Sequence, residues 1–160
     1  MLRRLLLLLL LSLSHIAVAA IGFMAGIYLL PTIIEPAPPE AAALHAAESA
    51  ALFSAEVRRD HPGSDFLHWG EGRFAVGKAA IAMRGELAPG PDYKLYLSRR
   101  PVGNAAEFEA VKAHALRLGD VRAFHGFIMD VPPHADVEQY NTVVIWCETF
   151  RKFITAATYR

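Results

Sequence analysis

The sequence predicts an all-β domain, an antiparallel sandwich or barrel of short strands, preceded by an N-terminal transmembrane helix and a short helical stalk. One long apolar run occupies the start of the chain, whereas Gly and Pro punctuate short stretches with two-residue periodicity from His61 onward. The chain has 160 residues, of which 54% are hydrophobic and 20% charged, so it is too apolar to be a disordered chain. We therefore divide it into an anchor (1–34), a linker with the stalk (35–60) and a β domain (61–160).

The anchor is defined by the segment from Leu5 to Leu30, which contains no Asp, Glu, Lys or Arg. As a helix rising about 1.5 Å per residue it would be roughly 39 Å long, which exceeds the roughly 30 Å hydrocarbon core and fits a tilted span. Arg3 and Arg4 precede the segment and Glu35 follows it, and positive charge favours the cytoplasmic side. The sequence thus predicts a single-pass protein of the inner (cytoplasmic) membrane, with the rest of the chain on the extracytoplasmic, periplasmic side.

A cleaved secretory signal peptide is the alternative interpretation of the same segment. Such a signal has a positively charged region, an apolar region and a cleavage site of small residues. These regions would correspond to Arg3-Arg4, the leucine run and Ala17-Val18-Ala19. Cleavage there would leave Ile21 to Leu30 as an apolar tail, which favours an uncleaved anchor. A lipid-anchored precursor is excluded, because no cysteine lies near the apolar run.

Proline-rich and alanine-rich segments connect the anchor to the β domain. Glu35-Pro36-Ala37-Pro38-Pro39 favours an extended, stiff backbone, as expected of a spacer that leaves the bilayer. From Glu40 to Arg59 the chain is rich in Ala, Leu and Glu and carries a narrow apolar stripe at helical spacing. We expect a stalk helix over 40–59.

The β domain is predicted to contain short strands and one short helix. Asn104 followed by Glu107 forms a capping-box pattern, which predicts a helix or turn over Ala105 to Ala110. The composition of Ala88 to Asp92 predicts a turn. The predicted strands are Arg73 to Lys78, Ala79 to Arg84, Tyr93 to Ser98, His114 to Leu118, Val121 to Asp130, Thr142 to Cys147 and Lys152 to Tyr159.

The charge balance excludes one class of partner. The chain has 16 Lys and Arg against 16 Asp and Glu, and from Glu35 onward 14 basic residues stand against 16 acidic ones, a net charge of −2. Domains that bind nucleic acids carry clustered positive charge, so we expect no nucleic-acid partner.

The segment from Gly70 to Ala75, Gly-Glu-Gly-Arg-Phe-Ala, has the letters of a dinucleotide-binding motif. That motif needs a strand before it and a helix after it to bind phosphate, whereas here a strand is predicted to follow. We therefore interpret these glycines as a tight turn in which glycine permits a positive φ.

The chain has one cysteine, Cys147, which ends the apolar run that begins at Thr142. A single cysteine excludes an intrachain disulfide, a Cys-x-x-Cys redox pair, covalent haem attachment through Cys-x-x-Cys-His and multi-cysteine zinc sites. Two interpretations remain, an inert core residue or a functional thiol outside the cytoplasm. A functional thiol could act as a nucleophile, a sulfenate-forming redox centre or an axial haem ligand.

Five histidines lie in the β domain, and no two form the i, i+4 pair of helical metal sites, so the spacing predicts no metal site. In the predicted strand over 121–130, His125 shares a face with Ala123 and Phe127. If that face is the inner one, His125 is either a hydrogen-bonded core histidine or a ligand. His68 allows the same two interpretations.

The segment from Val143 to Ala157, Val-Val-Ile-Trp-Cys-Glu-Thr-Phe-Arg-Lys-Phe-Ile-Thr-Ala-Ala, resembles the closing signature of the DM-thirteen domain, an electron-transfer domain of extracytoplasmic proteins. Earlier segments agree in their order along the chain. These are His68 to Gly72, Pro89 to Ser98 with its Gly-Pro-Asp and Tyr-Leu elements, Leu118 to Asp120, and Phe124 to Gly126. The resemblance covers roughly Asp65 to Tyr159.

The resemblance implies an all-β domain in which Cys147 is the redox (catalytic) residue, as a bare thiol or through a bound group such as haem. His68 and His125 are our candidates for second ligands of such a cofactor. Met129 is a third candidate, because strand alternation places it on the His125 face. The electron donor and acceptor do not follow from the resemblance.

We therefore expect a membrane-anchored redox module in which Cys147 exchanges an electron directly or ligates a redox cofactor, with a redox partner protein at the membrane. The alternative is a non-catalytic envelope binding or scaffolding domain in which the cysteine has a structural role. A hydrolase or transferase is not supported, because no nucleophile, base and orienting group can be assembled from these motifs.

Overall fold

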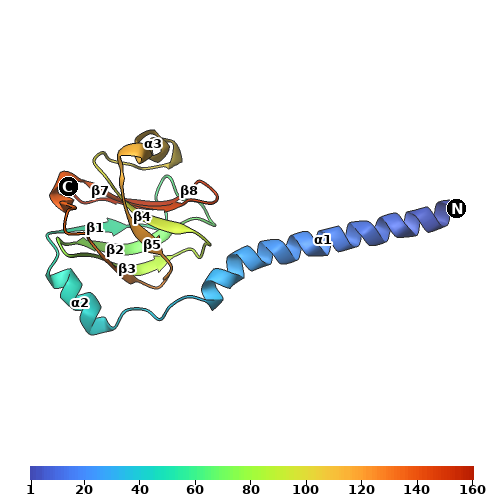
Figure 1. The fold of residues 1–160 in the computed structure, drawn as a ribbon, viewed down its shortest axis with the longest axis horizontal. Coiled ribbons are helices and arrows are strands. Elements are labelled where there is room, and N and C mark those ends of the chain that lie inside the picture. Colours follow the sequence, from blue (N-terminus) through green and yellow to red (C-terminus); the bar gives the residue numbers. More distant parts are fainter.

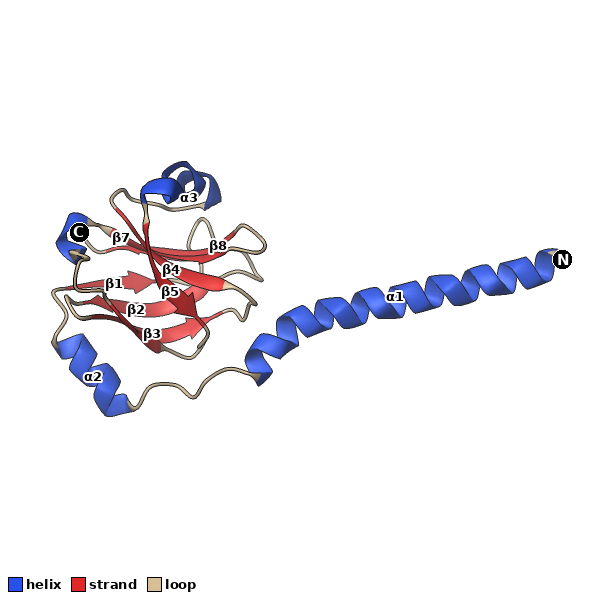
Figure 2. Cartoon of the chain, viewed as in Figure 1, coloured by secondary structure: helices blue, strands red, loops and turns tan.

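Two antiparallel sheets of four strands form the folded domain, and a long helix projects from one end of it (Figures 1 and 2). This computed structural model describes residues 1–160. The predicted fold class is confirmed. In order across the sheets, the first contains β1 (Phe53–Val57), β2 (Gly70–Val76), β3 (Ala80–Leu87) and β6 (Phe127–Asp130), and the second contains β5 (Leu116–Val121), β4 (Tyr93–Ser98), β7 (Thr142–Cys147) and β8 (Lys152–Thr158).

The two sheets form a sandwich whose edge strands meet. β1 lies against β8, where the rings of Phe53 and Tyr159 have their centroids 5.4 Å apart. β5 lies against β6, where the Met129 side chain packs on Gly119. Each open edge is thus covered by a strand of the other sheet, which shields its unpaired backbone groups.

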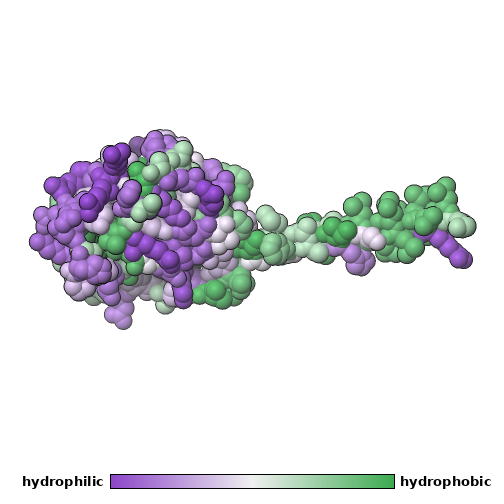
Figure 3. Space-filling view, turned by 45° about the horizontal axis from the view of Figure 1, so that its top comes forward, coloured by the Kyte–Doolittle hydropathy of each residue, from purple (hydrophilic) through white to green (hydrophobic).

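Helix α1 (Leu2–Ile33) extends away from the sandwich (Figure 1). At about 1.5 Å per residue its 32 residues span roughly 48 Å, and none of them is buried. Figure 3 shows a mostly hydrophobic helix surface beside a mostly hydrophilic sandwich surface. By length and composition α1 could cross a membrane, so it is compatible with a single-pass anchor.

The stalk prediction is correct only for its first half. α2 covers Ala41–Ser49, and the chain then enters β1 instead of continuing as a helix to Arg59. α2 packs on the outer face of the first sheet, where Leu44 is buried. Arg84 of β3 donates two hydrogen bonds to the Glu48 carboxylate, at 2.7 and 2.8 Å. The segment is therefore a part of the folded domain and not a free stalk.

The second half of the predicted helix is a strand because its residues also fit a two-residue period. Phe53, Ala55 and Val57 face the core, whereas Ser54 and Glu56 are exposed. Pairing with β2 satisfies the backbone hydrogen-bonding groups of this segment, and this pairing favours a strand over the helix that the apolar stripe predicted. The sandwich therefore begins before His61.

The predicted strand over 121–130 is two strands, β5 and β6, joined by a loop of residues 122–126. Gly126 has a φ of 90°, a left-handed conformation that ends the strand alternation. The side chain of His125 is 58% exposed. The prediction that Met129 and His125 share one strand face is therefore wrong.

The glycines of the Gly70 to Ala75 segment lie within β2 and not in a tight turn. Gly72, with a φ of 130°, is the register partner of Gly85 on β3, which has a φ of 150°. A Cβ on Gly72 would lie 2.2 Å from the carbonyl oxygen of Arg84. The positive φ is confirmed, but it serves the close approach of two strands.

β7 is buried on both faces and links two layers of the core. Val143, Ile145 and Cys147 point between the sheets, while Val144 and Trp146 point to the outer side. Helix α3 (Ala105–Val111) covers that outer side, and the side chain of Asn104 accepts a hydrogen bond from the Glu107 amide at 3.0 Å, as the capping pattern predicts. Two short 3-10 helices, Lys112–His114 and Val137–Gln139, complete the fold.

Four connections lie at the end of the sandwich from which α1 leaves, and we call it the α1-side end (Figure 1). Glu35 fixes this end to α1, because its carboxylate accepts hydrogen bonds from the amides of Phe124 at 2.6 Å and His125 at 3.1 Å. The four connections are residues 58–69, 88–92, 122–126 and 148–151.

Candidate functional site

Cys147 and Tyr93 are neighbours at the α1-side end of the second sheet. They are register partners on β7 and β4, and side chains in this relation have Cβ atoms about 4.5–5.5 Å apart. Each residue is 2% exposed. The thiol and the phenol therefore lie together at the buried end of the core.

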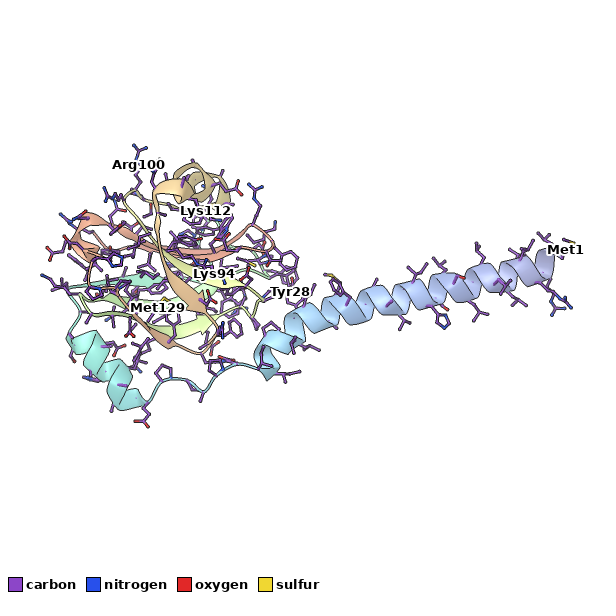
Figure 4. The ribbon with its side chains drawn as sticks, viewed as in Figure 1. Met1, Tyr28, Lys94, Arg100, Lys112 and Met129 are labelled. Atoms are coloured by element: carbon purple, nitrogen blue, oxygen red, sulfur yellow. The ribbon has the colours of Figure 1, made fainter.

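A cavity of about 20 Å³ lies beside this pair and has room for about one water molecule. It brings together two residues that the sequence predicted for the site, Cys147 and His68, and adds the end of α1. Figure 4 shows Tyr28 at this end of α1, beside the sandwich. The lining residues are Ile27, Tyr28, His68, Pro89, Gly90, Pro91, Tyr93, Cys147 and Phe150.

His68 is oriented by Asp65. The Nδ1 atom of His68 lies 2.9 Å from both carboxylate oxygens, and the amides of Leu67 and His68 donate to Oδ1 at 2.8 Å. Burial acts to raise the pKa of Asp65, but these hydrogen bonds hold it below its ordinary value. A carboxylate at Nδ1 favours the tautomer that carries its hydrogen there, which leaves Nε2 free to accept a proton.

Cys147 is a neutral thiol at physiological pH. Burial raises the pKa of the thiol, and the negative charge of Asp92 acts in the same direction. The nearby amides of Phe150, Asp92 and Thr149 act in the opposite direction without reversing the shift. Because the thiolate is the nucleophilic form of cysteine, this environment does not favour thiol–disulfide exchange.

The hydroxyl of Tyr93 is buried and has no hydrogen-bond partner. Burial raises its pKa, so the phenol stays neutral. An unsatisfied buried hydroxyl costs about 1–3 kcal/mol, so it needs a physical explanation. The hydroxyl therefore provides an unused polar group at the Cys147 cavity.

The Gly-Pro-Asp element before β4 shapes the site. A Cβ on Gly90 would lie 2.4 Å from the Tyr93 hydroxyl, so this position has no space for a side chain. Asp92 holds the turn after Cys147, because its carboxylate accepts hydrogen bonds from the amide and the hydroxyl of Thr149 at 3.1 and 2.8 Å. One motif thus packs on the phenol and fixes the turn beside the thiol.

A family model described as Electron transfer DM13 matches residues 64–159, which contain Cys147, Tyr93 and the Asp65–His68 pair. The chain belongs to this family. The match confirms the resemblance drawn from the motif around Cys147. α1, α2 and β1 lie outside the matched residues. Ile27 and Tyr28, which line the cavity, therefore do not belong to the DM13 domain. The searches of curated proteins and of solved structures gave no match.

The other two candidate ligands lie elsewhere in the DM13 domain. The Nδ1 atom of His125 lies 3.0 Å from the Glu35 carboxylate, so this histidine takes part in the contact with the end of α1. Met129 packs on Gly119 at the edge between β5 and β6. Neither residue lines the Cys147 cavity.

Seven of the nine lining residues were not predicted for the site. Tyr93 was predicted only as the first residue of a strand, and Ile27 and Tyr28 were assigned to the anchor. The signal that could have identified Tyr93 is the Gly-Pro-Asp-Tyr sequence, in which Gly90 removes the side chain that would collide with the phenol. No local signal connects α1 with residues 40 or more positions away.

The DM13 domain in this arrangement does not accommodate a haem at Cys147. The cavity at the thiol holds about 20 Å³, whereas pockets for ligands of that size span about 300–1,000 Å³. A neighbouring groove has a volume of about 540 Å³, but it contains no His, Cys, Met or Tyr side chain that could be an axial ligand. The groove is lined by Phe23, Gly26, Ile27, Leu30, Pro31, Ile34, Gly90, Pro91, Val121, Arg122 and Phe124.

Proposed function

We propose that this protein is an electron-transfer domain anchored by α1 in the inner membrane, with the sandwich on the extracytoplasmic side and the Cys147 thiol as its redox group. Membership of a family described as electron transfer supports the general activity. One observation supports the residue assignment: the single thiol, an unpartnered Tyr93 hydroxyl and the His68 imidazole line one cavity. These groups can supply one electron and accept one proton.

The proposed chemistry is a coupled loss of one electron and one proton from the thiol. The S–H bond of Cys147 breaks, the electron passes to a one-electron acceptor at the membrane, and a thiyl radical remains. The proton passes to Nε2 of His68, directly or through a water molecule beside the Tyr93 hydroxyl. Asp65 stabilises the imidazolium that forms, because its carboxylate is already hydrogen-bonded to Nδ1. The imidazolium then releases this proton to water, so oxidation releases one proton with one electron, and reduction reverses these steps.

Anchoring by α1 would place the Cys147 chemistry at the membrane surface. A domain tethered at the membrane meets membrane-bound partners at a high effective concentration, so a redox partner protein there would need no large docking surface of its own. The helix that carries the anchor also lines the Cys147 cavity, through Ile27 and Tyr28. We therefore expect electron transfer to take place at the α1-side end.

Voltammetry of the full chain in lipid nanodiscs tests the assignment. We expect a reversible one-electron signal that disappears in Cys147→Ser. Ala157→Ser is the matched control, because it also places a hydroxyl in the main core, on β8 and away from the cavity. We expect that variant to keep the signal, since it leaves the thiol unchanged.

A visible spectrum recorded before and after dithionite, with a thiol count, separates the alternatives. A Soret band that shifts on reduction and vanishes in Cys147→Ser would replace the thiol mechanism with haem ligation. If Cys147→Ser keeps every redox property of the wild type, the redox assignment is wrong. The scaffolding function then becomes the better account.

A further inference from the structure

The α1-side end carries most of the exposed apolar side chains of the sandwich. Outside the anchor, four large hydrophobic residues are exposed, and three of them lie at this end: Phe66 (85%), Leu67 (38%) and Phe150 (47%). The fourth, Leu52 (47%), precedes β1 at the opposite end. Exposed apolar side chains gathered at one end of a domain mark an interaction surface.

The length of α1 places this end near the level of the bilayer surface. The roughly 30 Å hydrocarbon core is spanned by about 20 residues. Because Ile27 and Tyr28 contact the sandwich, the part of the apolar segment that is free to cross this core is residues 5–24 and not the whole of 5–30. The following turns project from the core, and there Ile27 and Tyr28 meet Phe150 and His68 at the Cys147 cavity. Tyrosine at this depth is typical of the aromatic belt of membrane proteins.

The connection between α1 and the sandwich holds that position. Glu35 follows α1 by two residues, and its side chain is 11% exposed. It accepts three hydrogen bonds from the loop of residues 122–126, two from amides and one from the His125 ring. The sandwich is thus docked on the end of the helix and does not hang on a free linker.

The charges at this end favour an apolar partner over a charged one. The four connections contain four arginines, Arg58, Arg59, Arg122 and Arg151, and four acidic residues, Asp60, Asp65, Asp92 and Glu148. The net charge is therefore zero, and no excess of positive charge selects anionic lipids. The apolar groove of about 540 Å³ opens beside the same helix turns.

We propose that the α1-side end of the sandwich rests on the bilayer, with Phe66, Leu67 and Phe150 inserted among the lipid head groups. This inference rests on the proposed anchoring by α1. The Cys147 cavity then faces the membrane instead of the aqueous compartment, because Phe150 and Tyr28 line it and lie at the same surface. The electron acceptor or donor that reaches Cys147 is consequently a lipid-soluble or membrane-embedded carrier.

Tryptophan substitutions in the full chain measure the depth of this surface. Phe66→Trp and Phe150→Trp report from the proposed contact, and Leu52→Trp is the matched control, since Leu52 and Phe150 are equally exposed. Each variant is reconstituted in phosphatidylcholine nanodiscs, with and without lipids brominated near the head group. The fluorescence of the wild type, which contains Trp69 and Trp146, is subtracted.

We expect brominated lipid to lower the added fluorescence at positions 66 and 150 at least about twofold, because interfacial side chains lie about 5–10 Å into the boundary between head groups and acyl chains. Position 52 should show no quenching, and anionic lipid or added salt should change none of the three results. Equal quenching at all three positions, or none at 66 and 150 in discs that contain inserted chain, would overturn the proposal. The measurement does not depend on Cys147, so it can fail while the redox function stands.

Discussion

At the level of single residues, substitution of His68 tests whether this histidine accepts the proton of the Cys147 thiol or only lies beside it. We expect His68→Gln to lower the rate constant of electron transfer about 100-fold or more, the size typical of a lost general base. The potential should still fall by about 59 mV per pH unit, as in the wild type, because one proton leaves with one electron. The dependence on scan rate and pH in voltammetry measures both quantities.

The raised pKa of Cys147 sets the upper limit of that pH dependence. The thiol keeps its proton up to and above its ordinary value of 9.0, so the slope should persist across neutral pH and flatten only in more alkaline solution, where the thiolate is oxidised without proton loss. His134→Gln is the control, because His134 is exposed and lies outside the cavity, so its substitution should leave rate and slope unchanged. A rate that is insensitive to His68→Gln, or a flat potential near neutrality, would contradict the proton transfer.

At the level of elements, α3 stabilises the strand that carries the thiol. Phe108 is fully buried against Tyr96 and Trp146, with ring centroids 5.1 Å from each. We expect Phe108→Ala to lower the free energy of unfolding by about 3–5 kcal/mol, because it leaves a cavity between α3 and the second sheet. Urea denaturation followed by tryptophan fluorescence measures the loss.

Phe66→Ala is the control for that experiment, since its side chain is 85% exposed and its removal should change the free energy of unfolding of the detergent-solubilised chain by less than about 0.5 kcal/mol. Comparable losses in the two variants would show that α3 does not support β7.

The sequence predicted this helix and both ends of β4 and β7, because capping residues and apolar runs are local signals. It mistook β1 for a helix, because pairing with β2 decides between two compatible periods.

At the level of the whole molecule, Glu35 connects the membrane helix to the sandwich. We expect Glu35→Gln to increase hydrogen exchange of the amides in residues 122–126 roughly 10–100-fold, because hydrogen bonds to a charged group contribute about 1.5–3 kcal/mol. Glu40→Gln is the control, since Glu40 is exposed and caps no amide with its side chain. Exchange mass spectrometry of the full chain in nanodiscs measures the difference.

The same contact should weaken in acid. Burial acts to raise the pKa of Glu35, but the Phe124 amide and the His125 ring lower it below its ordinary value of 4.5. A carboxylate with a lowered pKa stabilises the docked state fully above its ordinary pKa and loses that effect as the pH falls through the lowered value. Wild type and Glu35→Gln should therefore exchange alike in strong acid. If their exchange rates still differ in strong acid, the effect of Glu35→Gln is due to packing and not to the charge of the carboxylate.

The sequence by itself determined the all-β class, the apolar helix and the identity of the redox candidate, because composition, hydrophobic periodicity and a motif around one cysteine are local properties of the chain. Only the tertiary structure decided that Cys147 faces the inner side of β7, that Tyr93 lies opposite it, and that the end of α1 covers both. It also separated His125 from Met129 through the left-handed backbone at Gly126. Strand register and the left-handed backbone conformation of a single residue both depend on contacts between distant segments. A one-residue shift in register moves every side chain of a strand to the other face of the sheet.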